Sequence, residues 1–432
     1  MYLLELLFFS GLAAGAVCHA YIYFNFLSFV FKLPVSGRVH ELNAKGTVFQ
    51  AFEMYRLKSC IDFKPYEGEK SFIKFEKQGG CFSSVGKQPS GQVLSLGTRC
   101  DHKAIVEHEL LHALGFYHMQ SRQDRDDYVK IWLDQVTDGH SLSTKTPDIP
   151  TITTNIPEFY NIIGQYLDFS EQDVVRLNKM YNCSSTLTLL DQCTFEYINI
   201  CGMIQSPTDD EDWVHTKSTP GSEDHTLIGQ CRGDDDKGWK IAHVPMDVGV
   251  KFRYAFQGVK GDPSNSNGGM FIDDISLVET RCPSAVWRIQ NFSQIMAEAD
   301  HNTFLDSPPF YSPEGYAYGI RVYPLANYTD YTGNYTGLYF HLASGENDMV
   351  MQWPAVDRQA TLVVMDQDPD IKLRMSSARS LTTDLSTTPE DKLYWDNPAR
   401  LEPTTLPASA TEVNQWDGEI SSNTLIYADV IT

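Results

Sequence analysis

Apolar side chains recur at helical spacing in the first half of the chain, and this periodicity predicts three helices. Asn43 to Lys58 carries apolar residues every three or four positions, and Ile105 to Phe116 does the same. Gly115 is expected to end the second helix, because glycine readily adopts the left-handed backbone that closes many helices. Glu171 to Tyr181 is the third predicted helix, and Ser170 before it is a good N-cap residue.

Alternation of apolar and polar residues replaces the helical spacing after Cys193, and one earlier strand is predicted at Ser71 to Phe75. The alternating segments are short and separated by turn residues, which is typical of β-sandwiches. The later predicted strands are Trp239–Val244, Lys251–Phe256, Met270–Leu277, Val286–Ile289, Tyr316–Tyr323, Leu338–Leu342 and Ala360–Met365. Thr383 to Thr411 is rich in Thr, Pro and Ser and is predicted to pack loosely.

The N-terminal stretch is apolar from Met1 to Phe31. Its first part, Met1 to Ala20, has the apolar centre and small end residues of a secretory leader, although Glu5 lies where basic residues are usual. Tyr21 to Phe31 continues the run with aromatic residues, so the whole stretch is also long enough for a membrane anchor. A leader is the preferred interpretation, and an anchor is the alternative.

Composition indicates a folded, acidic protein of several domains. The chain has 432 residues, which exceeds the size at which a single hydrophobic core stops growing, so two or three domains are expected. Hydrophobic residues make up 42% and aromatic residues 12%, enough apolar surface for packed cores. The formal net charge of −22 repels phosphate backbones, which argues against nucleic acid as a partner.

Cysteines and glycosylation sequons indicate an oxidising secretory route. The chain has nine cysteines, and sequons begin at Asn182, Asn291, Asn327 and Asn334. An odd number leaves one cysteine free, paired between chains or lost with a cleaved leader, and Cys18 is the candidate for the last case. We therefore expect a glycoprotein that is secreted or held at the cell surface.

The second predicted helix contains the sequence His108-Glu109-Leu110-Leu111-His112. Residues four apart lie on one helix face, so His108 and His112 are expected to direct their imidazoles to one zinc ion. Glu109 is positioned to take a proton from a metal-bound water, and after the turn at Gly115 the side chain of His118 is the predicted third ligand. This set predicts hydrolysis of a peptide carbonyl, with Glu109 as the general base and then the acid.

Chance explains this pattern poorly. An isolated HExxH arises by chance in roughly one chain of this length per hundred. Requiring Gly115 and His118 at their offsets lowers that frequency by roughly three more orders of magnitude. The other histidines, His102, His215, His225 and His243, lack such a context and are expected to be surface or core residues.

The segment from His108 to Val129 resembles the extended signature of the astacin family of metzincin zinc proteases, and its flanks resemble meprins. Tyr55 to Tyr66 and Leu167 to Cys183 lie around it as in that family. The resemblance implies disulfides between Cys60 and Cys183 and between Cys81 and Cys100, and one zinc per chain. The turn with Arg122, Asp124, Arg125 and Asp126 is expected to be solvated or salt-bridged and to support the third ligand.

The rest of the chain resembles two all-β modules. Cys193-Thr-Phe-Glu, Trp239 to Val244 and Gly268 to Ile275 are similar to a MAM domain. Val286 to Phe292, Gly315 to Gly319 and Ser344 to Asp348 are similar to a MATH (TRAF-like) domain. The order of protease, MAM and MATH is the meprin architecture, so the expected fold class is an α+β metzincin-type catalytic domain followed by all-β sandwich domains.

This architecture gives four predicted segments. Residues 1–41 are the leader or anchor with an unrecognised segment, 42–184 the astacin-like peptidase domain, 189–283 a shortened MAM-like domain and 284–432 a MATH/TRAF-like domain shortened near its C-terminus. The resemblance implies peptide and protein substrates and a homo- or hetero-oligomer formed through the MAM domain. Membrane association through the N-terminal segment or through a partner is also expected.

Several family features are missing from the sequence. The Met-turn beneath the metal and its nearby tyrosine are absent, since His140 leads almost directly into Pro147, and Tyr160 and Tyr166 lack the motif around a replacement. Met119 occupies the position where the family has a glutamate that binds the mature N-terminus, and a thioether cannot pair with an ammonium group. A splice form, an incomplete gene model or a decayed copy would each produce this pattern.

Two functions are therefore open. The intact ligand set favours a zinc endopeptidase, whereas the missing Met-turn favours a catalytically impaired MAM and MATH interaction protein that retains a zinc site. The acidic runs Asp209–Asp212 and Asp234–Asp236 are interpreted as solvated loops, because they lack the spacing of a calcium-binding loop.

Overall fold

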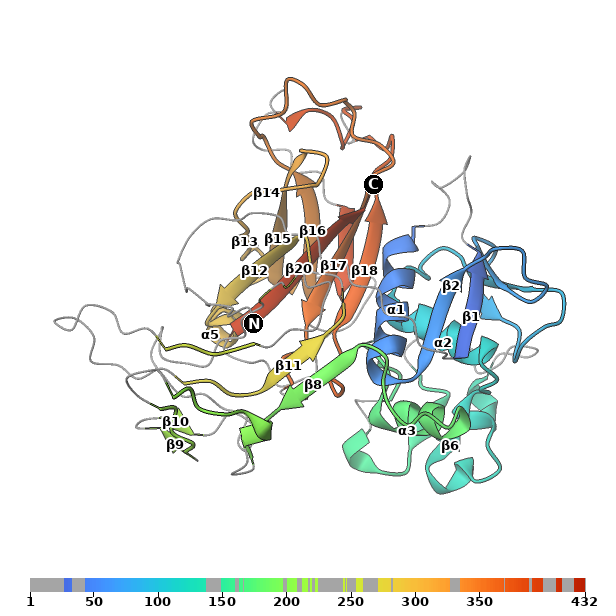
Figure 1. The fold of residues 1–432 in the computed structure, drawn as a ribbon. Helices are drawn as coiled ribbons and strands as arrows, with labels where there is room; N and C mark the ends of the chain where they lie inside the picture. Colours follow the sequence, from blue (N-terminus) through green and yellow to red (C-terminus); the bar gives the residue numbers. More distant parts are fainter. Residues whose placement is uncertain are drawn as a thin grey trace.

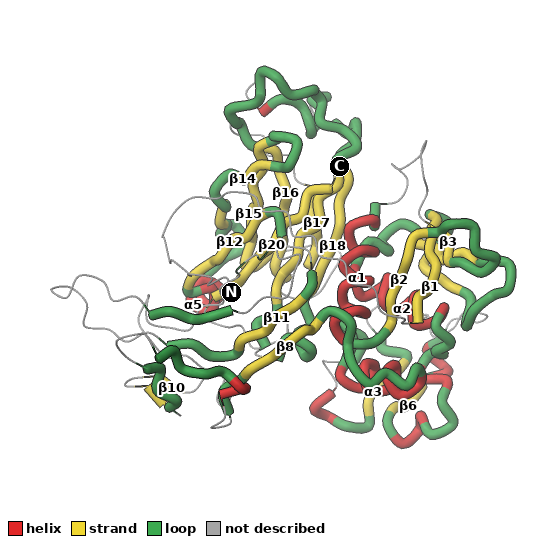
Figure 2. The backbone as a smooth tube through the Cα atoms, in the orientation of Figure 1, coloured by secondary structure: helices red, strands yellow, loops and turns green. Residues whose placement is uncertain are grey.

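The computed structural model describes residues 27–32, 43–136, 149–159, 163–165, 167–196, 200–207, 212–216, 218–219, 222–223, 244, 246, 254–258, 271–280, 283–326, 335–368, 370–387, 391–398, 409–413 and 423–431. Figure 1 and Figure 2 draw the remaining residues in grey. Among the described residues, no helix is both long and apolar enough to cross a membrane.

A mixed sheet forms the first block. Its strand order is β2 (Ile61–Pro65), β1 (Leu27–Lys32), β3 (Ile73–Glu76), β5 (Gln92–Leu96) and β4 (Cys81–Ser83). The neighbouring pairs are parallel except β4, which runs antiparallel to β5 at the edge. The strand β1 lies before the predicted start of the peptidase domain, so the end of the apolar N-terminal run is part of this sheet.

The three predicted helices are confirmed as α1 (Lys45–Lys58), α2 (Lys103–Ala113) and α3 (Glu171–Met180). The apolar faces of α1 and α2 meet against the sheet in one core, where the largest fully buried side chains include Tyr55, Phe75 and Leu110. Ser170 caps α3 as predicted, because its side chain accepts from the Asp173 amide while the Asp173 side chain accepts from the Ser170 amide.

Short elements connect α2 to α3. They are the 3₁₀ turns η2 (Met119–Ser121), η3 (Arg125–Asp127), η4 (Leu133–Gln135) and η5 (Pro157–Phe159), and the paired strands β6 (Val129–Ile131) and β7 (Ile152–Thr154). The segment between His140 and Pro147, from which the Met-turn is missing, lies outside the described residues.

The predicted MAM-like region contains two described strand pairs. These are β8 (Leu189–Cys193) with β11 (Ile275–Val278), and β9 (Ser218–Thr219) with β10 (Ser222–Glu223); η6 (Ile200–Gly202) lies between them in the chain. Of the predicted strands, Met270 to Leu277 is confirmed in part. Lys251 to Phe256 is wrong for its described residues, since Tyr254–Phe256 is not in a strand, and Trp239 to His243 lies outside the described residues.

The C-terminal block is a sandwich of two antiparallel sheets. One has the order β12 (Ala285–Gln290), β20 (Asn423–Ile431), β17 (Gln359–Met365) and β18 (Ser377–Thr382). The other contains β13 (Leu305–Asp306), β15 (Ala317–Ala326), β16 (Tyr335–Leu342) and β19 (Ser409–Val413), with β14 (Phe310–Tyr311) paired to β15; the helix α5 (Phe292–Glu298) follows β12. The four strands predicted here are confirmed as parts of β12, β15, β16 and β17.

Loose packing from Thr383 to Thr411 is a prediction that the structure contradicts for the described residues 383–387 and 391–398. Trp395 is only 3% exposed and packs in the core between the two sheets, and Asn397 is 4% exposed. The polar composition of the segment predicted a loose loop. Burial of one large aromatic side chain, Trp395, instead holds this part of the loop against the core. The strand β20 was also missed, although it pairs on both sides, with β12 and β17.

Three disulfides connect the described residues. Cys60–Cys183 and Cys81–Cys100 confirm the pairing that the family resemblance implied. Cys193–Cys201 is an additional bond, between β8 and η6. Cys18, Cys231 and Cys282 lie outside the described residues.

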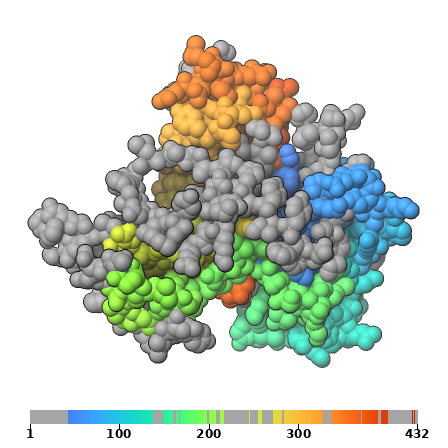
Figure 3. Space-filling model, viewed as in Figure 1, coloured from blue at the N-terminus to red at the C-terminus, as the bar shows by residue number. Residues whose placement is uncertain are grey.

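The first block docks onto the C-terminal sandwich through α1. In Figure 1, α1 lies beside β18, the edge strand of the four-stranded sheet, and hydrogen bonds join the two, including one from the Thr47 amide to Ser380 Oγ at 3.0 Å. In Figure 3, the blue and cyan surface of the first block lies to one side of the orange surface of the sandwich. The edge strand of the sandwich is therefore covered by a helix.

Candidate metal centre

The helix α2 carries His108 and His112 and ends in a turn that redirects the chain toward them. Gly115 has φ of 102°, the Gly115 amide donates to the His112 carbonyl at 2.8 Å, and the Phe116 amide donates to the Leu111 carbonyl at 2.9 Å. This pair of bonds is a Schellman motif, which needs a left-handed residue at the glycine position. The turn brings His118 back over the last turn of α2.

The three predicted ligands meet at one point. His118 Nε2 lies 3.1 Å from His108 Nε2 and 3.0 Å from His112 Nε2. In a tetrahedral zinc site with Zn–N bonds of about 2.05 Å, the ligand nitrogens are about 3.3 Å apart. Among the described residues, this is the cluster of three or more His, Cys, Asp or Glu side chains that fits a metal ion. The donor set and its spacing therefore fit zinc.

Hydrogen bonding and partial burial keep the imidazoles in the state that a metal requires. His112 Nδ1 lies 2.8 Å from the Phe116 carbonyl, so Nδ1 carries the proton and Nε2 keeps its lone pair. Desolvation, followed by the charges of His112 and His118, lowers the pKa of His108 to about 4. Desolvation and His112 also lower the pKa of His118. The neutral forms of His108 and His118 are therefore favoured at neutral pH.

Glu109 lies next to these three histidines, in a protected position between α2 and β4. The residue is 4% exposed, and its Oε2 atom is buried without a hydrogen-bond partner among the described residues. Burial raises the pKa of Glu109 to about 7, although a backbone hydrogen bond from Ser83, in β4, opposes the shift. A carboxylate in such a position is well placed to accept and return a proton near neutral pH.

The turn after His118 has the predicted salt bridges. Arg122 Nε donates to Asp124 Oδ1 at 2.7 Å, and Arg125 Nε lies 3.3 Å from Asp126 Oδ1. The Arg125 guanidinium also donates to the Gln120 carbonyl at 3.1 Å, which connects the turn to the residues that follow His118. These pairs are exposed, so they shape the turn more than they stabilise the protein.

At Met119, where this chain departs from the astacin pattern, the side chain has a different partner. Arg176 Nη1, on α3, lies 3.1 Å from Met119 Sδ, so an arginine approaches the thioether where the family has a glutamate. Met180 is 56% exposed at the end of α3. Tyr160 and Tyr166, weighed as replacements for the missing tyrosine, lie outside the described residues.

One group of residues near the centre was not found from the sequence. A buried cluster of ionisable side chains lies beneath α2 and consists of Lys58, Lys103, Glu107 and Asp168. The only sequence signal was the spacing of Lys103 and Glu107, four apart on a helix with an otherwise apolar face. Lys58 and Asp168 are too far from them in sequence to be linked without the fold.

Comparisons with known proteins give the same order of domains as the sequence motifs. The chain matches the profile of the astacin peptidase family over residues 35–143, "MAM domain, meprin/A5/mu" over 219–283 and "MATH domain" over 284–409. It is 43% identical over 478 residues to Meprin A subunit alpha of Rattus norvegicus, with 86% of this chain and 64% of the relative covered. The corresponding Mus musculus subunit is 42% identical over 466 residues, covering 84% and 62%.

Meprin A subunit beta of Homo sapiens is 39% identical over 482 residues, covering 88% of this chain and 68% of the relative. The chain belongs to the meprin family. Its fold class is therefore the predicted one, an astacin-type metzincin domain followed by MAM and MATH domains, and the family is one of zinc metalloproteases. The domain boundaries at 42, 184, 189 and 284 remain predictions.

The alignment to the rat meprin subunit is consistent with the prediction that internal segments are missing from this chain. The aligned 478 residues exceed 86% of the 432 residues here, so the alignment to the rat subunit contains gaps in this chain. The chain spans less than two thirds of the rat and mouse alpha subunits.

Proposed function

We propose that this meprin is a zinc endopeptidase in which His108, His112 and His118 hold one metal ion and Glu109 is the proton carrier. The observation that carries this proposal is the meeting of three imidazole Nε2 atoms beside a buried carboxylate with an unpartnered oxygen. When bound, zinc polarises a peptide carbonyl and lowers the pKa of a coordinated water to about 7.

Glu109 performs the proton transfers of this reaction. Its carboxylate takes the proton from the attacking water as the water oxygen bonds to the peptide carbon. It then gives that proton to the amide nitrogen as the C–N bond breaks, which leaves a free acid and a free amine. The buried position of Glu109, which raises its pKa to about 7, suits both halves of the transfer.

Zinc content and peptide cleavage together test the proposal. The purified protein is expected to contain about one zinc per chain and to cleave an internally quenched peptide. Glu109→Ala is expected to keep the zinc and lower the cleavage rate by at least about 100-fold, the usual contribution of a general base. Glu158→Ala is the control, since Glu158 is exposed in η5, and it should cleave at the wild-type rate.

A catalytically impaired interaction protein is the second candidate. The approach of Arg176 to Met119, in place of an acidic partner for the mature N-terminus, favours it. Zinc in the wild type without cleavage above Glu109→Ala would support this candidate and exclude the endopeptidase.

The family supports a proposal about where the protein acts. We propose that it is secreted or acts at the cell surface, as a glycoprotein whose substrates are peptides and proteins. A homo- or hetero-oligomer through the MAM domain, and membrane association through the N-terminal segment or a partner, are part of the same proposal. Sedimentation of the purified protein tests the oligomer, because a monomer at all concentrations would contradict it.

A further inference from the structure

Four ionisable side chains meet in the core beneath α2. Asp168 Oδ1 accepts a hydrogen bond from Lys58 Nζ at 2.8 Å, and Asp168 Oδ2 accepts one from Lys103 Nζ. Lys103 Nζ also lies 3.6 Å from Glu107 Oε1, and the four side chains are at most 2% exposed. Buried charges are costly unless they are paired, so the protein keeps these groups in one arrangement.

This cluster connects α1 to the helix that carries the ligands. Lys58 is the last residue of α1, Asp168 precedes α3, and Lys103 and Glu107 lie on α2. Tyr55, in α1, donates from its hydroxyl to the Glu107 carbonyl at 2.9 Å. Because Glu107 immediately precedes His108, these contacts set where α2 presents its first ligand.

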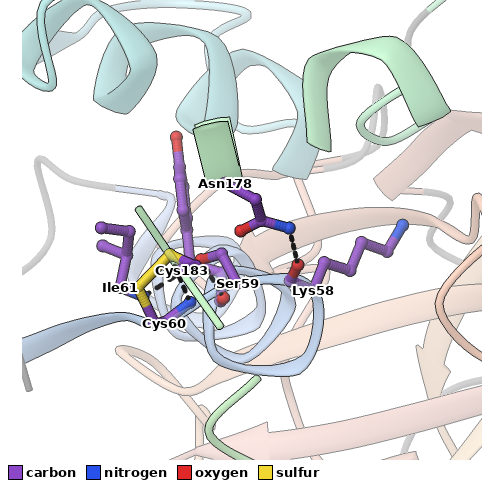
Figure 4. Close-up of a disulfide and its surroundings, with 7 residues drawn as sticks. Lys58, Ser59, Cys60, Ile61, Asn178 and Cys183 are labelled. Carbon is purple, nitrogen blue, oxygen red and sulfur yellow. Dashed lines mark hydrogen bonds between the residues drawn. A yellow bond between two sulfur atoms is a disulfide. The ribbon is translucent and has the colours of Figure 1, made fainter. Parts of the chain in front are cut away.

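Lys58 also reaches the MATH domain. Its Nζ donates to the Arg374 carbonyl at 2.7 Å, in the segment between β17 and β18. Figure 4 shows that the Lys58 side chain extends away from the Cys60–Cys183 disulfide, while its own carbonyl accepts from Asn178 Nδ2 at 3.0 Å. The backbone of Lys58 is therefore held by the peptidase domain and its ammonium group by both domains.

The other end of α1 is held by the MATH domain as well. The N-cap residue Ala44 has no side-chain cap, and the amides of Gly46 and Thr47 donate instead to Gln359 Oε1 at 2.8 Å and to Ser380 Oγ at 3.0 Å. The first amides of a helix lack partners within it, so the MATH domain completes α1. It also approaches closely, because a Cβ on Gly46 would lie 1.8 Å from Thr361 Oγ1.

We propose that Lys58 is a positioning residue of the metal centre, which sets the orientation of α2 by binding Asp168 and the Arg374 carbonyl at once. Docking of the MATH domain is thereby transmitted through α1 to His108. The proposal rests on the proposed function in that the three histidines must bind a metal.

Replacement of Lys58 in the full chain tests this role with Co²⁺ as the probe. Lys58→Met keeps much of the side-chain volume and removes the charge. It is expected to weaken Co²⁺ binding at least tenfold and to shift the visible absorption bands of the bound ion, which report ligand geometry. Lys64→Met is the matched control, since Lys64 pairs with Glu67 and Glu69 at the surface and its side chain is 42% exposed; its Co²⁺ spectrum should equal that of the wild type.

Lys58→Gln provides the same test with a shorter polar side chain, in case Lys58→Met fails to fold. It removes the charge that binds Asp168 and the Arg374 carbonyl together, and the same direction of spectral shift is expected. Folded variants of both kinds with wild-type Co²⁺ affinity and spectrum would overturn the positioning role. A wild-type chain that binds no Co²⁺ would instead overturn the proposed metal site.

Gly46→Ala tests whether docking of the MATH domain is transmitted to the centre. The added methyl group must push Thr361 and α1 apart, so the Co²⁺ bands should shift although Gly46 is far from the ligands in sequence. Gly79→Ala is the control, because a Cβ there meets nothing within 4 Å. Equal spectra for Gly46→Ala and Gly79→Ala would contradict transmission from the MATH domain.

Discussion

At the scale of single residues, the centre depends on which nitrogen of each imidazole remains free. The Phe116 carbonyl assigns the proton of His112 to Nδ1, and partial burial of His108 and His118 disfavours their charged forms. His108, His112, His118 and Glu109 were predictable from the sequence, because they lie within eleven residues and one helix with its terminal turn relates them. The buried carboxyl groups and lysines beneath them, Glu107, Asp168, Lys58 and Lys103, were not, because only the packing of distant segments brings these side chains together.

His102 gives a prediction at this scale. Burial, followed by the charge of Arg379, lowers its pKa to about 4, while Asp101 opposes the shift. A histidine in the unfolded chain titrates near about 6.5. As the pH falls, the unfolded state therefore takes up a proton on His102 before the folded state does. The contribution of His102 to the unfolding free energy is complete above about pH 6.5 and is lost as the pH falls toward 4.

Replacement of His102 should remove that part of the pH dependence. His102→Gln is expected to flatten the fall in unfolding free energy between about pH 7 and pH 4 by up to about 3 kcal/mol, the size of a shift of about 2.5 units. Urea unfolding at several pH values measures it, with His301→Gln as the control, since His301 is exposed. A curve for His102→Gln parallel to the wild type would contradict the assignment.

At the scale of elements, helix ends were predictable and loop packing was not. Gly115 and Ser170 act at the positions that their residue types indicated, since capping depends on the few residues around a helix end. The packing of Trp395 and the pairing of β20 depend instead on partners distant in the chain, and the polar sequence around Trp395 pointed the other way.

Ser170→Ala tests the cap of α3. The variant loses the acceptor for the Asp173 amide and the hydroxyl that donates to Asp173 Oδ2, so its unfolding free energy should fall by about 1 kcal/mol. Denaturant unfolding measures the change, with Ser90→Ala, in the exposed loop before β5, as the control. Equal stability of the two variants would show that the cap contributes nothing.

At the scale of the whole molecule, two sets of long-range contacts hold the peptidase domain together, a disulfide and the contacts of α1 with the MATH domain. The Cys60–Cys183 bond joins residues 123 apart, so it ties the end of α1 to the end of the domain. The MATH domain completes the start of α1, and α1 in turn covers the edge strand β18 of that domain. The domains are therefore interdependent, which the separate sequence motifs did not indicate.

Removing each disulfide in turn tests how much the long loop closed by Cys60–Cys183 contributes to stability. Loss of Cys60–Cys183 should lower the unfolding free energy by about 5 kcal/mol and loss of Cys81–Cys100 by about 3 kcal/mol, because the longer loop restricts the unfolded chain more. The double variants Cys60→Ser with Cys183→Ser, and Cys81→Ser with Cys100→Ser, allow the comparison by denaturant unfolding. A larger loss for the shorter loop, whose cysteines are 19 apart, would exclude the loop-entropy explanation.

The sequence alone was enough to predict the three histidines and Glu109 of the proposed metal centre, the helix ends and the order of domains. Each of these is encoded by residues close together in the chain, where spacing and residue type limit the geometry. Tertiary structure decided the buried cluster of Lys58, Lys103, Glu107 and Asp168, and the completion of α1 by the MATH domain. These depend on contacts between segments up to hundreds of residues apart, which no local pattern specifies.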